Sequence, residues 1–101
     1  PRGFAALQPR IGRTSPSRRL VAEAPVILMA YDLLEAAGRD LRALPLAERR
    51  TRLGLLVATV PPGQPLRLSP AQRDADLAAL RDRVVAEGAE GLMLKRLDSP
   101  Y

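Results

Sequence analysis

The chain has 101 residues, of which 47% are hydrophobic and 27% charged, so it suits one small folded domain or part of a larger one. It contains no Cys and no His, which excludes Cys/His zinc sites, thiol nucleophiles and disulfides and leaves carboxylates, Lys, Arg and the backbone for any chemistry. The net charge of +5 favours polyanionic partners, although an excess of solvated arginines explains it equally well. We take the cytoplasm as the default location, and no apolar run approaches the length of a membrane span.

Both ends of the chain suggest an internal piece of a longer protein. The chain begins with Pro1, and its two methionines, Met29 and Met93, lie inside apolar segments. Residues 98–101 follow directly after a strand-like run. We therefore expect residues 1–101 to be part of one domain, truncated at both ends. An Arg-rich transit peptide would require a true N-terminus and is discounted on that ground.

The opening of the chain predicts only short elements. Residues 4–11 could form a short helix that Pro9 interrupts, and residues 12–19 have the composition of a basic loop. One helical turn is expected over Leu20–Ala24. It should end there, because Pro25 directs the chain toward extended geometry.

The apolar run Val26–Leu34 predicts a central strand that is covered on both faces. Ala37 and Gly38 supply a turn, after which Arg39–Arg42 is expected to return as a short antiparallel partner. The segment therefore predicts a hairpin at the end of a buried strand.

An amphipathic helix is expected over residues 46–57, directly after Pro45. The apolar side chains that share one face of this helix are Leu46, Leu53, Leu56 and Val57. Glu48 can pair with Arg52 on the next turn of the helix.

The last third of the chain predicts a short extended segment, a second helix and a final strand. Residues 66–68 are expected to be extended, and residues 69–72 have the form of a capping box. The helix itself starts a few residues later, because its apolar stripe is Leu77, Leu80 and Val84, and Gly88 is expected to cap its end. Gly91–Lys95 predicts the final strand. This order indicates an α+β fold, with a mainly antiparallel sheet and packed helices.

Two segments carry a resemblance to a known family. Residues 30–41 (AYDLLEAAGRDL) and residues 90–96 (EGLMLKR), together with residues 45–50, resemble the part of ATP-dependent DNA ligases between the third and fourth nucleotidyltransferase motifs. The resemblance covers nearly the whole chain. It implies that residues 1–101 are the central part of an adenylation domain with an ATP-grasp-like nucleotidyltransferase fold.

The resemblance implies a nucleotide-binding role for four residues. Tyr31 would stack on adenine, although spacing alone favours a ring that simply packs in the sheet. Glu90 would contact the nucleotide or hold Mg²⁺, and Gly91 would let the backbone approach the ligand. Lys95 would meet a phosphate. The ordinary alternatives are a surface acid after a helix cap for Glu90 and a plain strand-end lysine for Lys95.

The family attacks ATP with a lysine in a Lys-x-Asp-Gly motif, and this sequence contains no such motif. Lys95 matches the fourth motif instead, so we expect no catalytic residue in the chain and no activity from the chain alone. Arg10 and Arg13 are candidates for contact with the DNA backbone, with a solvated basic loop as an equal alternative.

For the complete protein the resemblance implies an ATP-dependent DNA ligase that uses ATP and Mg²⁺ and seals nicks in double-stranded DNA, as repair, recombination and replication require. An RNA ligase or capping-type nucleotidyltransferase is the alternative within the class. A non-enzymatic basic module that binds nucleic acid is the alternative from another class. The oligomeric state stays open, with a monomer as the default, and no membrane partner is expected.

Overall fold

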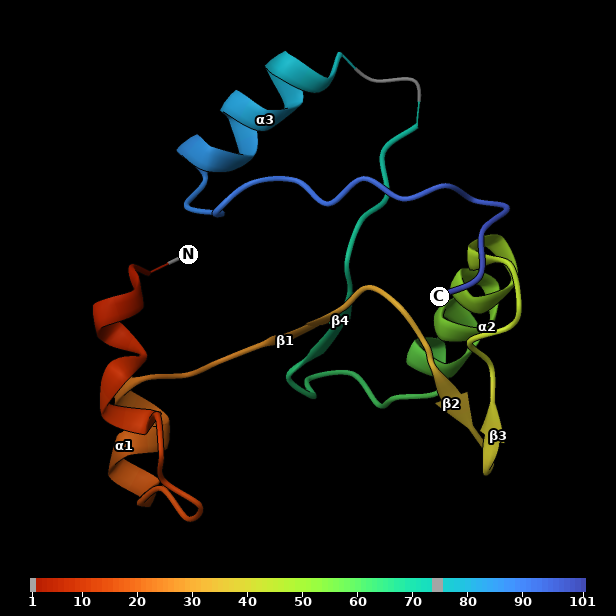
Figure 1. The fold of residues 1–101 in the computed structure, drawn as a ribbon. Helices are drawn as coiled ribbons and strands as arrows, with labels where there is room; N and C mark the ends of the chain where they lie inside the picture. Colours follow the sequence, from red (N-terminus) through yellow and green to blue (C-terminus); the bar gives the residue numbers. More distant parts are fainter. Residues whose placement is uncertain (1, 74–75) are drawn as a thin grey trace. The chain divides into compact units, whose positions relative to one another are not determined.

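The computed structural model describes residues 2–73 and 76–101 and shows an α+β chain with two small sheets (Figure 1). Its contacts divide it into two compact units, which are described separately. Unit 1 comprises Pro1–Val26 and Arg73–Leu92, and unit 2 comprises Ile27–Gln72 and Met93–Tyr101. Within the described ranges, no helix is both long and apolar enough to cross a membrane.

Unit 1 begins with two 3₁₀ turns, η1 (Phe4–Ala6) and η2 (Gln8–Arg10), in place of one short helix. Pro9 lies in the first positions of η2, where its missing N–H costs no hydrogen bond. The helix α1 (Arg18–Glu23) starts earlier than predicted, because the Ser17 hydroxyl accepts the Leu20 N–H at 3.2 Å. The expected basic loop therefore ends at Ser17 rather than at residue 19.

The second helix of unit 1, α3 (Leu77–Ala86), confirms the predicted helix but not the proposed cap at residues 69–72. The Asp76 carboxylate accepts the N–H groups of Ala78 and Ala79 at 3.0 and 3.1 Å, so Asp76 is the N-cap. Gly88 follows the helix end with φ of +90°, a conformation that glycine adopts without steric cost.

Unit 2 contains both sheets, and one of them differs from the prediction. The strand β1 (Leu28–Ala30) pairs in parallel with β4 (Leu66–Leu68), with Leu28 opposite Leu66. A parallel pair needs a long crossover, and the connection between these strands contains a helix. The expectation of a mainly antiparallel sheet was wrong for this pair, because the partner of β1 comes from beyond the hairpin.

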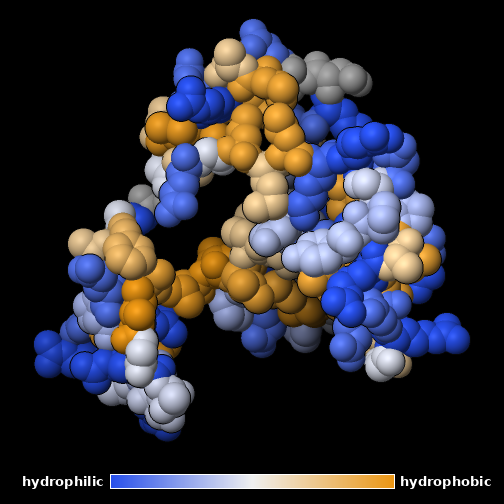
Figure 2. Space-filling view, viewed as in Figure 1, coloured by the Kyte–Doolittle hydropathy of each residue, from blue (hydrophilic) through white to orange (hydrophobic). Residues whose placement is uncertain are grey.

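The strand β1 is also shorter and more exposed than the predicted central strand. Ile27 is 57% exposed and Leu28 67% exposed, and apolar side chains lie open over β1 in Figure 2. Within the described ranges β1 pairs only with β4, and its first two residues are exposed, so β1 is not a strand covered on both faces.

The predicted hairpin is confirmed. The strands β2 (Glu35–Ala36) and β3 (Arg39–Asp40) pair antiparallel. Ala37 and Gly38 both have positive φ, at 50° and 71°, which is the geometry of a two-residue type I′ hairpin turn.

The helix α2 (Leu46–Ala58) confirms the predicted amphipathic helix. Leu46 and Leu53 are buried as expected, whereas Leu56 is 48% exposed. No side chain caps the start of α2; instead the Leu46 and Ala47 N–H groups donate to the carbonyls of Ser99 and Leu97 at 3.0 and 2.9 Å. The segment around residues 97–99 is therefore hydrogen-bonded to the start of α2 within unit 2.

The prediction of a strand at Gly91–Lys95 was wrong, because this described segment pairs with no other backbone segment and forms no strand. Its apolar sequence supplied the pattern of a strand, but a strand also requires an adjacent backbone to pair with. Beyond it, the Tyr101 N–H donates to the Arg42 carbonyl at 2.8 Å, which docks the chain end beside the hairpin.

Candidate functional site

A buried carboxylate, Asp32, is the centre of the side-chain cluster in unit 2. It lies two residues beyond β1, and its side chain is 5% exposed. Arg49 of α2, itself 2% exposed, donates from Nε to Oδ1 at 2.9 Å and from Nη2 to Oδ2 at 3.1 Å. Lys95 Nζ approaches Oδ2 at 3.2 Å, and the Leu33 N–H donates to Oδ1 at 2.8 Å. Three separate segments of the chain therefore meet at one carboxylate.

The electrostatics of this cluster keep Asp32 ionised. The pKa of Asp32 is lowered from 3.8 to about 2, mainly by the hydrogen bonds from Arg49, with burial opposing the shift and the Leu33 N–H and Lys95 also contributing to it. The same bonds raise the pKa of Arg49. Two cations, Arg49 and Lys95, therefore share one anion.

Lys95 also lies against an aromatic ring. Its Nζ is 4.7 Å from the centroid of the Tyr31 ring and 5.9 Å from that of Tyr101, and both distances lie within cation–π range. Tyr31 remains 52% exposed. The structure thus brings together two of the residues that the sequence singled out, an exposed aromatic face and a partly screened ammonium.

Arginines of α2 hold the backbone around this pair. Arg50 donates to the Tyr31 carbonyl at 3.1 Å and to the Ser69 carbonyl at 2.8 Å. Arg49 donates from Nη1 to the Leu44 carbonyl, and to the Ser99 carbonyl at 3.4 Å. The backbone at Tyr31 is therefore anchored to α2 by Arg50.

Glu90 and Gly91 belong to unit 1, and both are exposed. A Cβ at Gly91 would meet nothing within 4 Å, so the space that a ligand would need is open. The described residues contain no group of three or more metal-ligating side chains. A Mg²⁺ ion at Glu90 would therefore need phosphate oxygens or water to complete its coordination.

The two arginines predicted to contact DNA both donate to backbone carbonyls in unit 1. Arg10 Nη1 lies 2.6 Å from the Ala24 carbonyl, and Arg13 Nε lies 2.9 Å from the Pro9 carbonyl. Each guanidinium retains further N–H groups, so these bonds position the side chains without using all of their donors.

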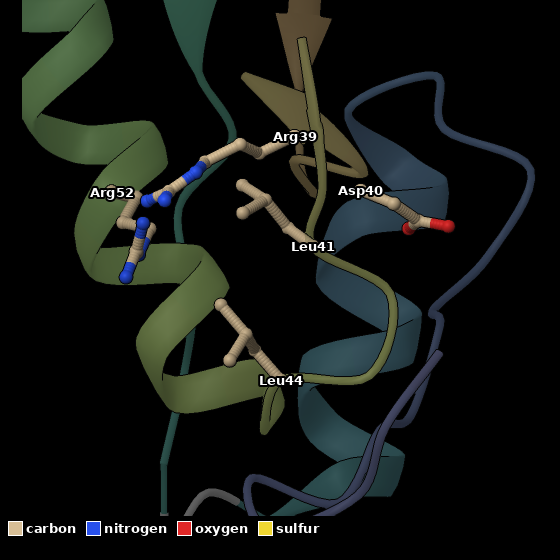
Figure 3. Close-up of a pocket in the computed structure, with 5 residues that line it drawn as sticks. All are labelled: Arg39, Asp40, Leu41, Leu44 and Arg52. Carbon is tan, nitrogen blue, oxygen red and sulfur yellow. The ribbon is translucent and has the colours of Figure 1, made fainter. Parts of the chain in front are cut away.

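An open pocket of about 410 Å³ lies between the hairpin and α2 (Figure 3). The side chains of Arg39 and Arg52 point toward one another across it, while the Asp40 carboxylate points away. Asp40 is held by Arg42 at 2.7 Å, and this pair lowers the pKa of Asp40 to about 2. None of the sequence-predicted site residues lines this pocket.

The Asp32–Arg49 pair was not predicted from the sequence. One signal was present, since Arg49 lies between Leu46 and Leu53 on the apolar face of α2. A cation on a core-facing stripe favours a buried acid as its partner, and Asp32 is the one charged residue within the apolar run Val26–Leu34.

Comparison with known proteins gives a consistent result. The family model described as "ATP dependent DNA ligase domain" matches residues 1–101. A DNA ligase of Haloferax volcanii is 38% identical over 101 residues, covering 100% of this chain and 17% of the relative. A probable DNA ligase of Streptomyces avermitilis is 35% identical over 107 residues, covering 100% of this chain and 20% of the relative. The chain thus spans about a fifth of the length of these curated relatives.

Proposed function

Because the chain belongs to the ATP dependent DNA ligase domain family, we propose that it supplies part of the nucleotide-binding site of an enzyme that seals nicks in double-stranded DNA with ATP. The observation that carries the proposal is the pairing of Tyr31 with Lys95, which come from distant parts of the sequence. An exposed ring and an adjacent cation suit a planar base that carries anionic phosphates.

In this proposal each site residue has one task. Tyr31 stacks on the adenine ring, and Lys95 provides positive charge beside it. Glu90 holds Mg²⁺, which when bound neutralises phosphate charge, and Gly91 allows the backbone close to the nucleotide. Arg10 and Arg13 contact the phosphates of the DNA backbone through their remaining donors.

The lysine that would accept AMP is not among these residues. Lys95 is the one lysine in the sequence, and its ammonium already contacts Asp32 and the Tyr31 ring. We therefore place the nucleophile in the remainder of the full-length protein, in an ATP-grasp-like nucleotidyltransferase domain of which this chain is the central part.

The test uses the full-length protein with α-labelled ATP and Mg²⁺, followed by a search for protein-bound AMP and by joining assays on nicked DNA. Replacement of Tyr31 by Leu should raise the KM for ATP about fivefold or more, because stacking of a base on an aromatic side chain stabilises by about 1 to 3 kcal/mol. The matched control is Phe4→Leu, which removes another exposed ring, 65% exposed, in unit 1 and should leave the KM unchanged.

Three outcomes would redirect the proposal. An unchanged KM in Tyr31→Leu would remove the stacking role. If the protein is labelled with AMP but joins nicked RNA better than nicked DNA, an RNA ligase or capping-type enzyme would be favoured. The absence of any label on the folded full-length protein would leave a basic nucleic-acid-binding module as the better account.

A further inference from the structure

We propose that Asp32 is a positioning residue that holds the Lys95 ammonium against one face of the Tyr31 ring, so that a nucleobase must stack on the opposite face. This inference rests on the proposed function, because it specifies how the same ring receives its base. It assigns Lys95 to the base side of the nucleotide rather than to the phosphates.

The geometry of the carboxylate supports this role. Arg49 contacts both oxygens of Asp32 in a forked arrangement, which fixes the plane of the carboxylate. The Leu33 N–H occupies a second site on Oδ1, so the remaining acceptor capacity lies on Oδ2, where Lys95 donates at 3.2 Å. The direction of the Lys95 contact is therefore set by Arg49 and by the backbone.

Lys95 requires such an anchor. A lysine has a flexible four-carbon stem, and free rotation would carry the ammonium into solvent. Its side chain is instead 26% exposed, and its Nζ is within reach of the carboxylate and of two aromatic rings. Asp32, with its side chain 5% exposed, is the fixed member of this arrangement.

The position of Lys95 decides which ring face is free. An ammonium 4.7 Å from the ring centroid occupies the space that a stacked base would need on that face. Tyr31 is nevertheless 52% exposed, and Arg50 holds its backbone carbonyl. A base can thus reach the ring only from the side that Lys95 does not cover.

A double-mutant cycle on the full-length protein tests the inference. Equilibrium binding of ATP is measured for wild type, Asp32→Asn, Lys95→Met and the double variant. Loss of the cation–π contact should weaken ATP binding about 3- to 30-fold in Lys95→Met, and Asp32→Asn should give a similar loss. If Asp32 acts through Lys95, then adding Asp32→Asn to Lys95→Met should change the affinity by less than about twofold.

A purely structural Asp32 would behave differently. Its substitution would then weaken binding by the same factor whether or not Lys95 is present, and that result would overturn the inference. The matched control is Asp40→Asn, the same substitution at an exposed carboxylate that pairs with Arg42, and it should leave ATP affinity unchanged.

If Asp32→Asn fails to fold, a second measurement still tests where Lys95 acts on the nucleotide. Lys95→Met leaves the Asp32–Arg49 pair intact, so its binding of adenosine and of ATP can be compared directly. A base-side lysine predicts the same fold loss for both ligands, whereas a loss confined to ATP would place Lys95 at the phosphates and refute the inference. Failure of the proposed function is separate, because it would appear as unchanged ATP binding in Tyr31→Leu.

Discussion

Replacement of Arg49 by Met should locally destabilise unit 2 more than any surface substitution. Arg49 is 2% exposed and makes two hydrogen bonds to Asp32, whose side chain is 5% exposed. Without Arg49, the carboxylate stays buried with Lys95 as its only charged partner among the described residues. Breaking a buried ion pair by removing one partner costs about 3 to 5 kcal/mol, a large part of the stability of a typical domain.

The assay is native-state hydrogen exchange on the full-length protein, followed at the amides of α2. A loss of about 3 kcal/mol corresponds to roughly a hundredfold drop in protection. The double variant Asp32→Leu/Arg49→Met should recover most of it, because two apolar side chains leave no buried charge unpaired. Protection in Arg49→Met within about threefold of wild type, or a double variant as labile as the single one, would refute this account of the pair.

Three further predictions concern other groups. The pKa of Asp32 is lowered from 3.8 to about 2, so its ionised form stabilises unit 2 fully above pH 3.8, and the protection of the α2 amides, corrected for the pH dependence of intrinsic exchange, should fall as pH falls from there toward 2; the same pH dependence in Asp32→Leu/Arg49→Met would contradict this assignment. Gly38→Val should weaken the hairpin by about 1 to 2 kcal/mol, because its φ of 71° is strained for a β-branched residue, and exchange at the Leu41 amide reports it. Asp76→Ala should destabilise α3 by about 1 kcal/mol through loss of its N-cap, with faster exchange at Ala78 and Ala79 as the measure and Asp82→Ala, later in the helix, as the control.

Local signals in the sequence were sufficient for part of the fold. The helix α2 follows from Pro45 and the apolar spacing after it, and the hairpin follows from the Ala37-Gly38 turn. Each of these elements is decided by residues within a few positions of one another. Their prediction needed no knowledge of what lies elsewhere in the chain.

Pairing between distant segments could not be predicted in the same way. The apolar runs at β1 and at Gly91–Lys95 have similar patterns, yet only β1 found a partner within the described residues, and that partner is parallel. Composition reports that a segment is apolar, whereas strand formation depends on which backbone lies beside it. The parallel pairing of β1 with β4 could therefore be identified only from the structure.

The candidate site, too, could be predicted from the sequence only in part. The resemblance to a family singled out Tyr31 and Lys95 separately, and their contact is a property of the fold. The Asp32–Arg49 pair joins residues 17 positions apart, and Lys95 meets Asp32 across 63 positions. The spacing rules for helices and strands relate residues only a few positions apart, so they could not predict these contacts.

The capping of α2 has a consequence for the order of folding. A 13-residue helix is marginal by itself in water, where isolated helices shorter than about 12 to 15 residues rarely persist. The acceptors for its first two N–H groups, Ser99 and Leu97, are synthesised about 50 residues later. On a ribosome that makes the protein from its N-terminus, α2 emerges before its cap exists, so the start of the helix is capped only after residues 97–99 have been made and have docked against it.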